Sequence, residues 1–421
     1  MQKKLLAKSV ATSLVLALVA GLNTVPAQAA DKELVVWADE TRGPNLTKVF
    51  AAKGDWVSGY KITVRAFSSF DALKEAVDKA TDLTGPDIVV GANDWVPTGA
   101  KNGKLAPITL PASVRARFTP NNFFDLSYKG KLYGVPLDIN NVAMIYNEDL
   151  VKNAPKSLGE MVNYYKANKT KKNLAAGLCS TQGPGMSWGA HMVLSALGGA
   201  AYRMKNGAVD TSKPPFNPAE LAANVKTYLL DANGKSNGFF PATDVGCKEN
   251  FLAGKVPFAI IGNWAWQEYM EAGFQPNYMA VPGVKAGTFG TMFGSVSGAL
   301  LTSFAAKRGV EAGAKDLLIN FFASTAGATA YQAIELRPPA EKGAQSKVEF
   351  TAQQNLGKAA ARAGIPQIGS ILNGTTGSKS YWDLLPAFWT AVLVNGRDPL
   401  AEARKMSDFF IKNVAAGVKD L

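Results

Sequence analysis

The chain has 421 residues, a formal net charge of +12 at pH 7, and apolar side chains at 47% of its positions. A chain of this length with that apolar content builds more than one core, and two α/β lobes are the simplest arrangement. One histidine and two cysteines are too few for a structural zinc site or for most histidine-based triads, so we expect no metal and no cofactor.

The first residues have the pattern of an export signal. Three lysines precede an apolar run over Val10–Leu22, which is too short to span a bilayer, and Ala27-Gln28-Ala29 follows as a cleavage motif. We expect residues 1–29 to be a signal peptide that is cut after Ala29; a buried N-terminal helix is the alternative. Because no cysteine follows the apolar run, a lipid anchor is not indicated. The protein is therefore expected in the periplasm or at the exterior of the cell envelope.

The charge of the mature chain does not indicate a nucleic-acid partner. The leader contains three lysines and no acid, so its removal lowers the net charge from +12 to +9. The remaining basic residues are scattered, and aromatic residues do not alternate with them. We interpret the charge as an aid to solubility and to attraction by an anionic envelope, and we expect no nucleic-acid binding.

The two cysteines, Cys179 and Cys247, are expected to form one disulfide in an oxidising compartment. Closing a loop of about 70 residues would stabilise the fold by roughly 4 kcal/mol in the chain-entropy account. A free reactive thiol is the alternative. The single histidine, His191, lies in an apolar helical pattern, so we expect a hydrogen-bonded core or surface residue rather than a catalytic one.

Strands and helices alternate in the first part of the mature chain. Glu33–Trp37 is predicted as a strand that ends in the polar loop Ala38–Gly43, and Pro44 then starts a helix. A second strand is predicted over Lys61–Phe67, an amphipathic helix follows, and Asp87–Val90 is a short apolar strand suited to a sheet that is covered on both faces. This alternation is typical of a parallel, doubly wound sheet.

Three polar loops are predicted at one edge of that sheet, where ligands bind in doubly wound folds. They are Ala38–Gly43, Gly91–Trp95 and Asp138–Asn141, and each contains a carboxylate. Trp95 adds an aromatic plane. Loops are commonly polar for no functional reason, which is the alternative for any one of them. Three together favour a ligand site.

The stretch around Pro136 is predicted to connect the two lobes. Proline cannot donate to a sheet ladder, so Pro136 should interrupt the strand and mark an edge or a crossover between sheets. Asp138, Asn140 and Asn141 are polar where a buried strand would be apolar. An ordinary hairpin is the alternative. We interpret the stretch as a strand that leaves one lobe, passes a polar cleft and enters a second lobe through Ala143–Tyr146.

Apolar strands with aromatic residues at their ends continue in the second part of the chain. Val256–Gly262 is predicted as a strand that runs into Trp264 and Trp266, of which at least one should face the cleft. Met292–Leu301 is a strand with permissive glycines and is predicted to be a second crossover. Asp398 is predicted to cap a closing helix.

Aromatic planes that alternate with aspartate, asparagine and arginine around a cleft suit a carbohydrate. Pyranose rings have apolar C–H faces that stack on indoles, and their hydroxyl groups need planar donors and acceptors. Core packing is the alternative for Trp264, Trp266 and Trp382, each taken alone.

Several short motifs occur in an order and spacing that is characteristic of a known family. They are Leu34–Trp37, Thr84–Val89, Gly130–Pro136, Ile145–Leu150, Gly262–Trp266, Ile365–Gln367 and Tyr381–Trp382. The chain resembles the extracellular solute-binding proteins that serve ABC importers, in the group that contains the maltose/maltodextrin-binding protein. The resemblance covers nearly the whole mature chain.

This resemblance implies an α/β fold of two doubly wound lobes joined by three crossover segments, of the type II periplasmic-binding-protein kind. It implies a monomer without enzymatic activity, which closes on a mono- or oligosaccharide and presents it to permease subunits in the membrane. The implied segments are 30–138 with 299–335 for the N-terminal lobe, 143–293 with 340–421 for the C-terminal lobe, and 139–142, 294–298 and 336–339 for the hinge crossovers.

The resemblance also implies roles for particular residues. Arg42 corresponds to a basic ligand contact, Asp94 to a carboxylate that binds hydroxyl groups, and Asn140 to a first-crossover carboxylate. Trp264 and Trp382 correspond to stacking aromatics. The full set of predicted ligand-binding residues is Asp39, Glu40, Arg42, Asp94, Trp95, Asp138, Asn140, Trp264 and Trp382.

The chain departs from the family pattern at three places. Gly183 and Gly185 replace an acid and a tyrosine that precede the position filled by Trp188. Thr41 replaces the carboxylate beside the basic residue of the first loop. Gly91 replaces a tryptophan, for which the nearby Trp95 could compensate. We therefore expect a sugar that differs from maltose in size or linkage.

Two alternative functions remain open at this point. A secreted glycoside hydrolase could use two of Asp39, Asp94 and Asp138 as an acid/base pair, although no sequence feature singles out such a pair. The same binding fold could also take another small solute, such as an anion or a polyamine. The aromatic residues favour a sugar, and the basic charge disfavours a polycation.

Overall fold

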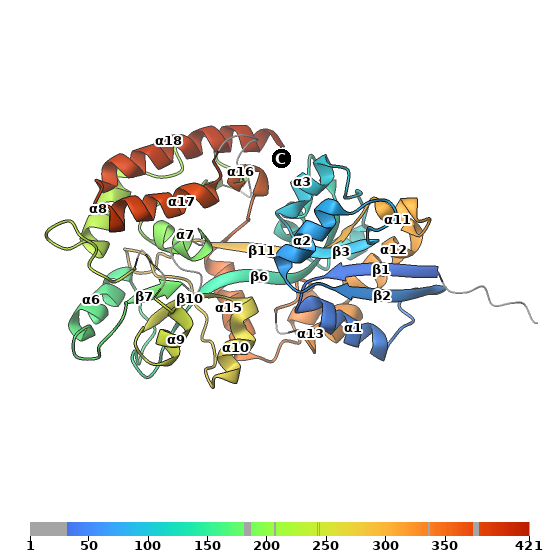
Figure 1. The fold of residues 1–421 in the computed structure, drawn as a ribbon, viewed down its shortest axis with the longest axis horizontal. Coiled ribbons are helices and arrows are strands. Elements are labelled where there is room, and N and C mark those ends of the chain that lie inside the picture. Colours follow the sequence, from blue (N-terminus) through green and yellow to red (C-terminus); the bar gives the residue numbers. More distant parts are fainter. Residues whose placement is uncertain are drawn as a thin grey trace, which may run out of the picture. The chain divides into compact units, whose positions relative to one another are not determined.

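The computed structural model describes residues 32–180, 187–205, 208–241, 243, 245–335, 337–373 and 379–420. The predicted signal peptide and the substitutions at Gly183 and Gly185 lie outside the described residues. Figure 1 shows the fold. Up to the first crossover the elements are β1 (Lys32–Ala38), α1 (Arg42–Ala52), β2 (Tyr60–Ala66), α2 (Phe70–Lys79), β3 (Ile88–Ala92), α3 (Trp95–Lys101), α4 (Ala112–Arg115), α5 (Pro120–Phe124), β4 (Ser127–Tyr128), β5 (Lys131–Leu132) and β6 (Gly134–Tyr146).

The chain then forms α6 (Leu158–Asn168), β7 (Leu178–Ser180), α7 (Ser187–Ala196), β8 (Met204–Lys205), β9 (Ala208–Val209), α8 (Pro218–Leu229), α9 (Cys247–Leu252), β10 (Phe258–Gly262), η1 (Asn263–Ala265), α10 (Trp266–Glu271) and β11 (Met292–Leu301). The last elements are α11 (Phe304–Lys307), α12 (Glu311–Leu317), η2 (Leu318–Phe322), α13 (Thr325–Gln332), α14 (Lys342–Gln345), α15 (Thr351–Ala363), β12 (Gly364–Ile365), α16 (Gly369–Leu372), α17 (Tyr381–Trp389), η3 (Thr390–Val394), α18 (Pro399–Gly417) and η4 (Val418–Asp420).

One eight-stranded sheet contains the long strands β6 and β11, which lie side by side in Figure 1. The order is β2-β1-β3-β11-β6-β10-β7, with β12 paired to β11. Strands β1, β2 and β3 are parallel to one another, as the alternation of strands and helices predicts. Strand β6 pairs with β11 over its first part and with β10 over its last five residues. The predicted α/β class is thus confirmed.

Strand β6 runs through Pro136 without a break, so the prediction that this proline interrupts the strand is wrong. The reason is a bulge: Asp138 pairs with Ser297 and Pro136 pairs with Gly298, which leaves Leu137 as an extra residue in β6. A bulge interrupts the regular hydrogen bonds between two strands. At such a place a proline, which has no N–H to donate, is tolerated. The carbonyl of Leu137, the extra residue, accepts a hydrogen bond from the N–H of Ala340.

The buried apolar residues form two separate cores, and we call the parts of the molecule around them the first and the second lobe. The core of the first lobe includes Leu34, Val89 and Leu300. The core of the second lobe includes Ile145, Ile260 and Phe410. Each lobe therefore draws on segments that are far apart in the sequence, and β6 and β11 contribute to both cores.

A third extended segment lies against β6 on the side opposite to β11. The N–H of Ile139 donates to the carbonyl of Pro338 at 2.7 Å, and Asp138 forms a bridge with Pro339. Residues after this point still contact the first lobe: Ala340 is part of its core, and the N–H of Lys342 donates to the carbonyl of Arg117. Three segments of the chain thus run together between the lobes.

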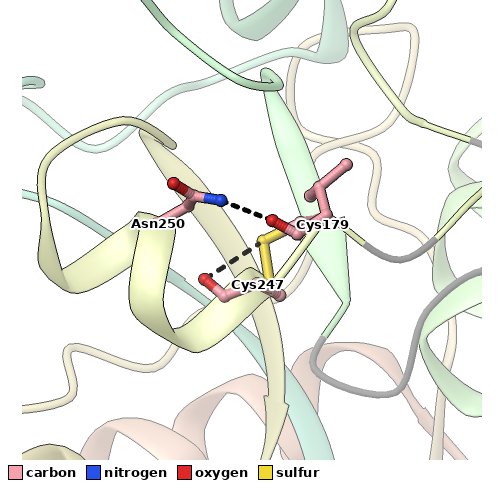
Figure 2. The surroundings of a disulfide bond; sticks show 4 residues. Cys179, Cys247 and Asn250 are labelled. Atoms are coloured by element: carbon pink, nitrogen blue, oxygen red, sulfur yellow. Dashed lines mark hydrogen bonds between the residues drawn. A yellow bond between two sulfur atoms is a disulfide. The ribbon is translucent and has the colours of Figure 1, made fainter.

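The second lobe contains the disulfide that the sequence predicts. Cys179 of β7 is bonded to Cys247, the first residue of α9, with their Cα atoms 5.6 Å apart. Figure 2 shows the side-chain amide of Asn250, which donates to the carbonyl of Val245 just before α9. The disulfide holds the start of α9 against the strand, and the Asn250 hydrogen bond holds the residues just before it.

The longest helix, α18, closes the second lobe. As predicted, Asp398 caps it by accepting a hydrogen bond from the N–H of Ala401, and Pro399 occupies its first turn. Its apolar face, with Ala403 and Phe410, is buried. No helix in the described part of the chain has both the length and the hydrophobicity needed to cross a bilayer.

Candidate functional site

A cavity of about 620 Å³ has walls from both lobes. Helices α2 and α3 of the first lobe provide one wall, and tryptophans of α7 and α17 of the second lobe face it. Both the volume and the mixture of aromatic and polar side chains are typical of a site for a small ligand. Residues that decide its chemistry are Phe70, Lys74, Asp94, Trp95, Trp188 and Trp382.

Trp95 lies directly on Gly91 in the first-lobe wall. A Cβ atom added at Gly91 would come within 2.5 Å of the Trp95 ring. The indole also contacts Phe70, with 4.7 Å between ring centroids. The absence of a side chain at Gly91 therefore makes the space that Trp95 fills, in agreement with the suggestion that one compensates for the other.

Alanine at Gly91 is expected to displace the Trp95 ring and to lower the free energy of unfolding by about 1–3 kcal/mol, the usual effect of overpacking. Urea unfolding at pH 7 measures the loss, and tryptophan emission reports the moved ring. Gly54→Ala is the matched control, because its added Cβ would meet nothing closer than 3.7 Å. Wild-type stability in Gly91→Ala would show that the ring is not confined by Gly91.

Asp94 brings a carboxylate to the same wall. It occupies the cap position of α3, yet its side chain makes no capping hydrogen bond there. Burial raises the pKa of Asp94 to about 6, against the partial opposition of the Lys74 ammonium group, which also lines the cavity. A carboxylate that is desolvated and not used by its own helix is suited to binding hydroxyl groups of a ligand.

Two tryptophans, Trp188 and Trp382, line the opposite wall, and a third, Trp264, contacts Trp188. The ring of Trp188 lies edge-on to Trp264 and to Trp382, with centroid distances of 5.8 Å and 6.0 Å. Trp382 is the second residue of α17, and its indole N–H donates to Oδ1 of Asn373 at 2.9 Å. Trp266, in contrast, is a core residue, whereas Trp264 is half-buried and reaches the cavity only through its contact with Trp188. Trp188 was not in the predicted set.

The start of α17 is held by a capping box, which fixes the position of Trp382. Ser380 accepts a hydrogen bond from the N–H of Asp383, and the carboxylate of Asp383 accepts from the N–H of Ser380. Trp264 is held in a comparable way by packing, because its ring covers Gly262, where a Cβ atom would come within 2.2 Å.

Asp39, Arg42 and Asp138 lie together, but they are buried and pair with one another instead of lining the cavity. Arg42 makes a 2.6 Å ion pair with Asp39 and a two-pronged contact with Asp138, in which both N···O distances are 2.9 Å. Burial opposes the charge on each partner. The attraction outweighs it, so the pKa of Asp39 falls to about 2 and the pKa of Arg42 stays well above its usual value.

The structure thus divides the predicted residues. Asp94, Trp95 and Trp382 line the cavity, and Trp264 is in ring contact with Trp188 of its wall. Glu40 is exposed in the first loop. Asn140 is half-buried, and its Oδ1 has no hydrogen-bond partner among the described residues.

His191 is a core residue, as predicted. Its Nε2 lies 2.9 Å from Oγ1 of Thr291, its Nδ1 contacts the hydroxyl of Tyr381, and its ring stacks on Phe293. Burial lowers the pKa of His191 to about 3, so the imidazole is neutral at physiological pH. Within the described ranges, histidine, cysteine and acidic side chains do not gather in any group that could hold a metal ion.

Comparison with known proteins decides the family. The family described as bacterial extracellular solute-binding protein matches residues 45–358, well over half of the chain. The chain belongs to this family. The predicted family and the two-lobed fold are therefore confirmed, and the solute-binding protein is not expected to have enzymatic activity, because the family and the relatives that follow are described as binding proteins.

Curated relatives of the solute-binding protein are similar over part of their length. A galactooligosaccharide-binding protein of Bacillus subtilis is 26% identical over 271 residues, which are 61% of each chain. A maltotriose-binding protein of Pyrococcus abyssi is 25% identical over 62% of this chain and 55% of its own. A maltodextrin-binding protein of Bacillus subtilis is 28% identical over 47% of both. The chain thus matches about three fifths of the length of the first two.

Proposed function

We propose that the solute-binding protein is exported, takes an oligosaccharide of the maltodextrin or galactooligosaccharide kind into the cavity between its lobes, and delivers it to the permease of an ABC importer. The observation that carries the proposal is the cavity with an indole in one wall, two indoles in the other and the Asp94 carboxylate beside them. Indoles on both sides suit the two apolar faces of a pyranose ring, and the carboxylate suits its hydroxyl groups.

The names of the relatives support a sugar ligand, since each is described as binding an oligosaccharide. Removal of residues 1–29, the absence of a lipid anchor, a monomeric state and closure about crossovers at 139–142, 294–298 and 336–339 belong to the same proposal. Binding would favour the closed form, and the closed form would be presented to the membrane partner.

Tryptophan fluorescence of residues 30–421 tests the ligand class, with maltose, maltotriose, a galactooligosaccharide, trehalose, sucrose and glucose as probes. A saturable change without consumption of the sugar supports a sugar-binding protein. Release of monosaccharide would support the hydrolase alternative. No response to any probe would contradict the proposed ligand class and favour another small solute.

Alanine at Trp382 is expected to weaken sugar binding roughly 10- to 150-fold, because a buried indole contributes about 1.5–3 kcal/mol through its contact area. Isothermal titration calorimetry measures the affinity. Trp56→Phe is the control, since Trp56 packs on Phe321 in the first lobe and does not line the cavity. Unchanged affinity in Trp382→Ala would contradict the assignment of the aromatic wall.

A further inference from the structure

Arg42 is the most heavily engaged side chain in the region between the lobes. Its guanidinium group donates four hydrogen bonds. Nε and Nη2 donate to the two carboxylate oxygens of Asp138, Nη1 donates to Asp39, and Nη2 also donates to Oγ of Ser297 at 2.6 Å. Only 2% of the residue is exposed. A ligand in the cavity could reach this group only after these bonds were broken.

The partners of Arg42 belong to different crossover strands. Asp138 lies in β6 and Ser297 in β11, and the two are direct neighbours in the ladder. One arginine from the first loop therefore holds both strands at the point where they leave the first lobe. The two-pronged geometry with Asp138 fixes the direction of the strand as well as its distance.

The third crossover is tied to the same loop. Nη2 of Arg337 donates to the hydroxyl of Thr41 at 3.1 Å, and its Nη1 pairs with Glu335 at 2.8 Å. The hydroxyl of Thr41 in turn donates to Asp39, the partner of Arg42. Loop residues 39–42 thus contact all three crossovers through a continuous set of hydrogen bonds.

Such a set of buried ion pairs is stable only as long as every member is present. Removal of one member of a buried ion pair leaves a charge without compensation, which is strongly unfavourable, whereas the complete set adds mainly a unique geometry. Both arginines of the set are paired with carboxylates, so neither guanidinium group needs an anion from a ligand. These properties fit an anchor better than a ligand contact.

We propose that Arg42 is a positioning residue that anchors the first-lobe ends of the three crossovers, so that bending between the lobes starts beyond Asp138 and Ser297. Arg42 affects ligand affinity by limiting the range of positions that the two lobes take relative to one another. It does not touch the ligand. The inference extends the lobe closure of the proposed function, but its test uses the protein without ligand, so either can fail alone.

Distance measurement between two nitroxide labels in the unliganded protein provides the test. Cysteines for the labels replace Lys79 on α2 and Lys226 on α8, which are exposed helical positions in different lobes. Arg42→Gln is expected to make the distance distribution roughly twice as wide, because the freed crossovers bend over more residues. Arg42→Lys restores part of the charge contact, and Ser297→Ala removes one bond without exposing a charge, so both should be intermediate.

Arg308→Gln is the matched control, because Arg308 pairs with buried Asp87 at 3.0 Å in the same lobe but contacts none of the three crossovers at the described residues. A wild-type distribution in Arg42→Gln together with lost binding of an oligosaccharide probe would make Arg42 a ligand contact and overturn the proposal. Equal broadening in Arg308→Gln would also overturn it, since general destabilisation would then be the cause. If Arg42→Gln does not fold, an unchanged distribution in both Ser297→Ala and Arg42→Lys contradicts the anchor.

Discussion

Asparagine in place of Asp94 is expected to make the unliganded protein more stable and its ligand affinity lower. Burial raises the pKa of Asp94 from 3.8 to about 6, so the folded protein holds this proton more tightly than the unfolded chain does. Stability at this group is therefore highest below the unfolded pKa and falls as the pH rises through the folded value. At pH 7 the ionised carboxylate costs about 1–3 kcal/mol, after allowance for its partial exposure.

Urea unfolding checks the first half of this expectation. Asp94→Asn should be more stable than the wild type by about 1–3 kcal/mol at pH 7, and the difference should be nearly absent at about pH 3, where the Asp94 carboxyl is mostly neutral in both the folded and the unfolded protein. Asp82→Asn is the matched control, because Asp82 is an exposed aspartate paired with Lys307 at 3.7 Å, away from the cavity. An advantage of equal size at both pH values would show that ionisation of Asp94 is not its cause.

The expected loss of ligand affinity is checked by calorimetric titration. The ligand is the sugar that gives a response in the fluorescence test. Hydrogen bonds to a charged acceptor contribute about 1.5–3 kcal/mol, so Asp94→Asn should bind roughly 10- to 150-fold more weakly. Wild-type affinity should decrease as the pH falls below about 6, whereas the affinity of Asp94→Asn should not follow this profile. Full affinity in the variant would remove Asp94 from the ligand site. If both expected results are found, stability and binding are in conflict at Asp94, which is common at functional sites.

Replacement of Cys179 and Cys247 by alanine together is expected to lower the free energy of unfolding by about 2–4 kcal/mol. The bond closes a loop with a sequence separation of 68 residues, and most of its effect in the chain-entropy account comes from restricting the unfolded chain. Equilibrium unfolding in urea, followed by circular dichroism, measures the difference.

The wild-type protein in the presence of dithiothreitol is the natural control for this variant. Reduction should bring its unfolding midpoint to that of the double-alanine protein, while the variant itself should not respond to the reductant. A variant as stable as the oxidised protein would mean that the strand β7 and the start of α9 are held together by packing alone.

Local sequence signals predicted much of the fold because they act over short distances. The apolar run around Val35, the cap at Asp398 and the apolar run before Trp264 each specify an element through contacts within one turn or one strand. The disulfide followed from composition and compartment. Pro136 shows where local rules fail, since the bulge that accommodates it depends on the register with β11.

The candidate site was harder to predict because its geometry depends on contacts between distant residues. Arg42 and Asp138 are 96 positions apart, and their pairing converts a predicted ligand contact into a buried ion pair. Trp188 begins a helix of apolar pattern, which looks like core in the sequence, yet it lies at the cavity. Asp94 and Trp95, which line the cavity, were predicted because they lie in a polar loop that follows a predicted strand.

The interleaving of the two lobes along the chain also affects the order in which the protein can be made. The sheet of the first lobe needs β11, and its core needs residues of α12 and η2, so more than three quarters of the chain must be synthesised before that lobe can close. A shorter nascent chain contains β1, β2 and β3 but lacks β11, the strand that lies next to β3. Long-range pairing of this kind folds slowly. During synthesis the chain therefore stays unfolded for longer than a protein with contiguous domains would. An unfolded chain is what the proposed export through a membrane channel would need.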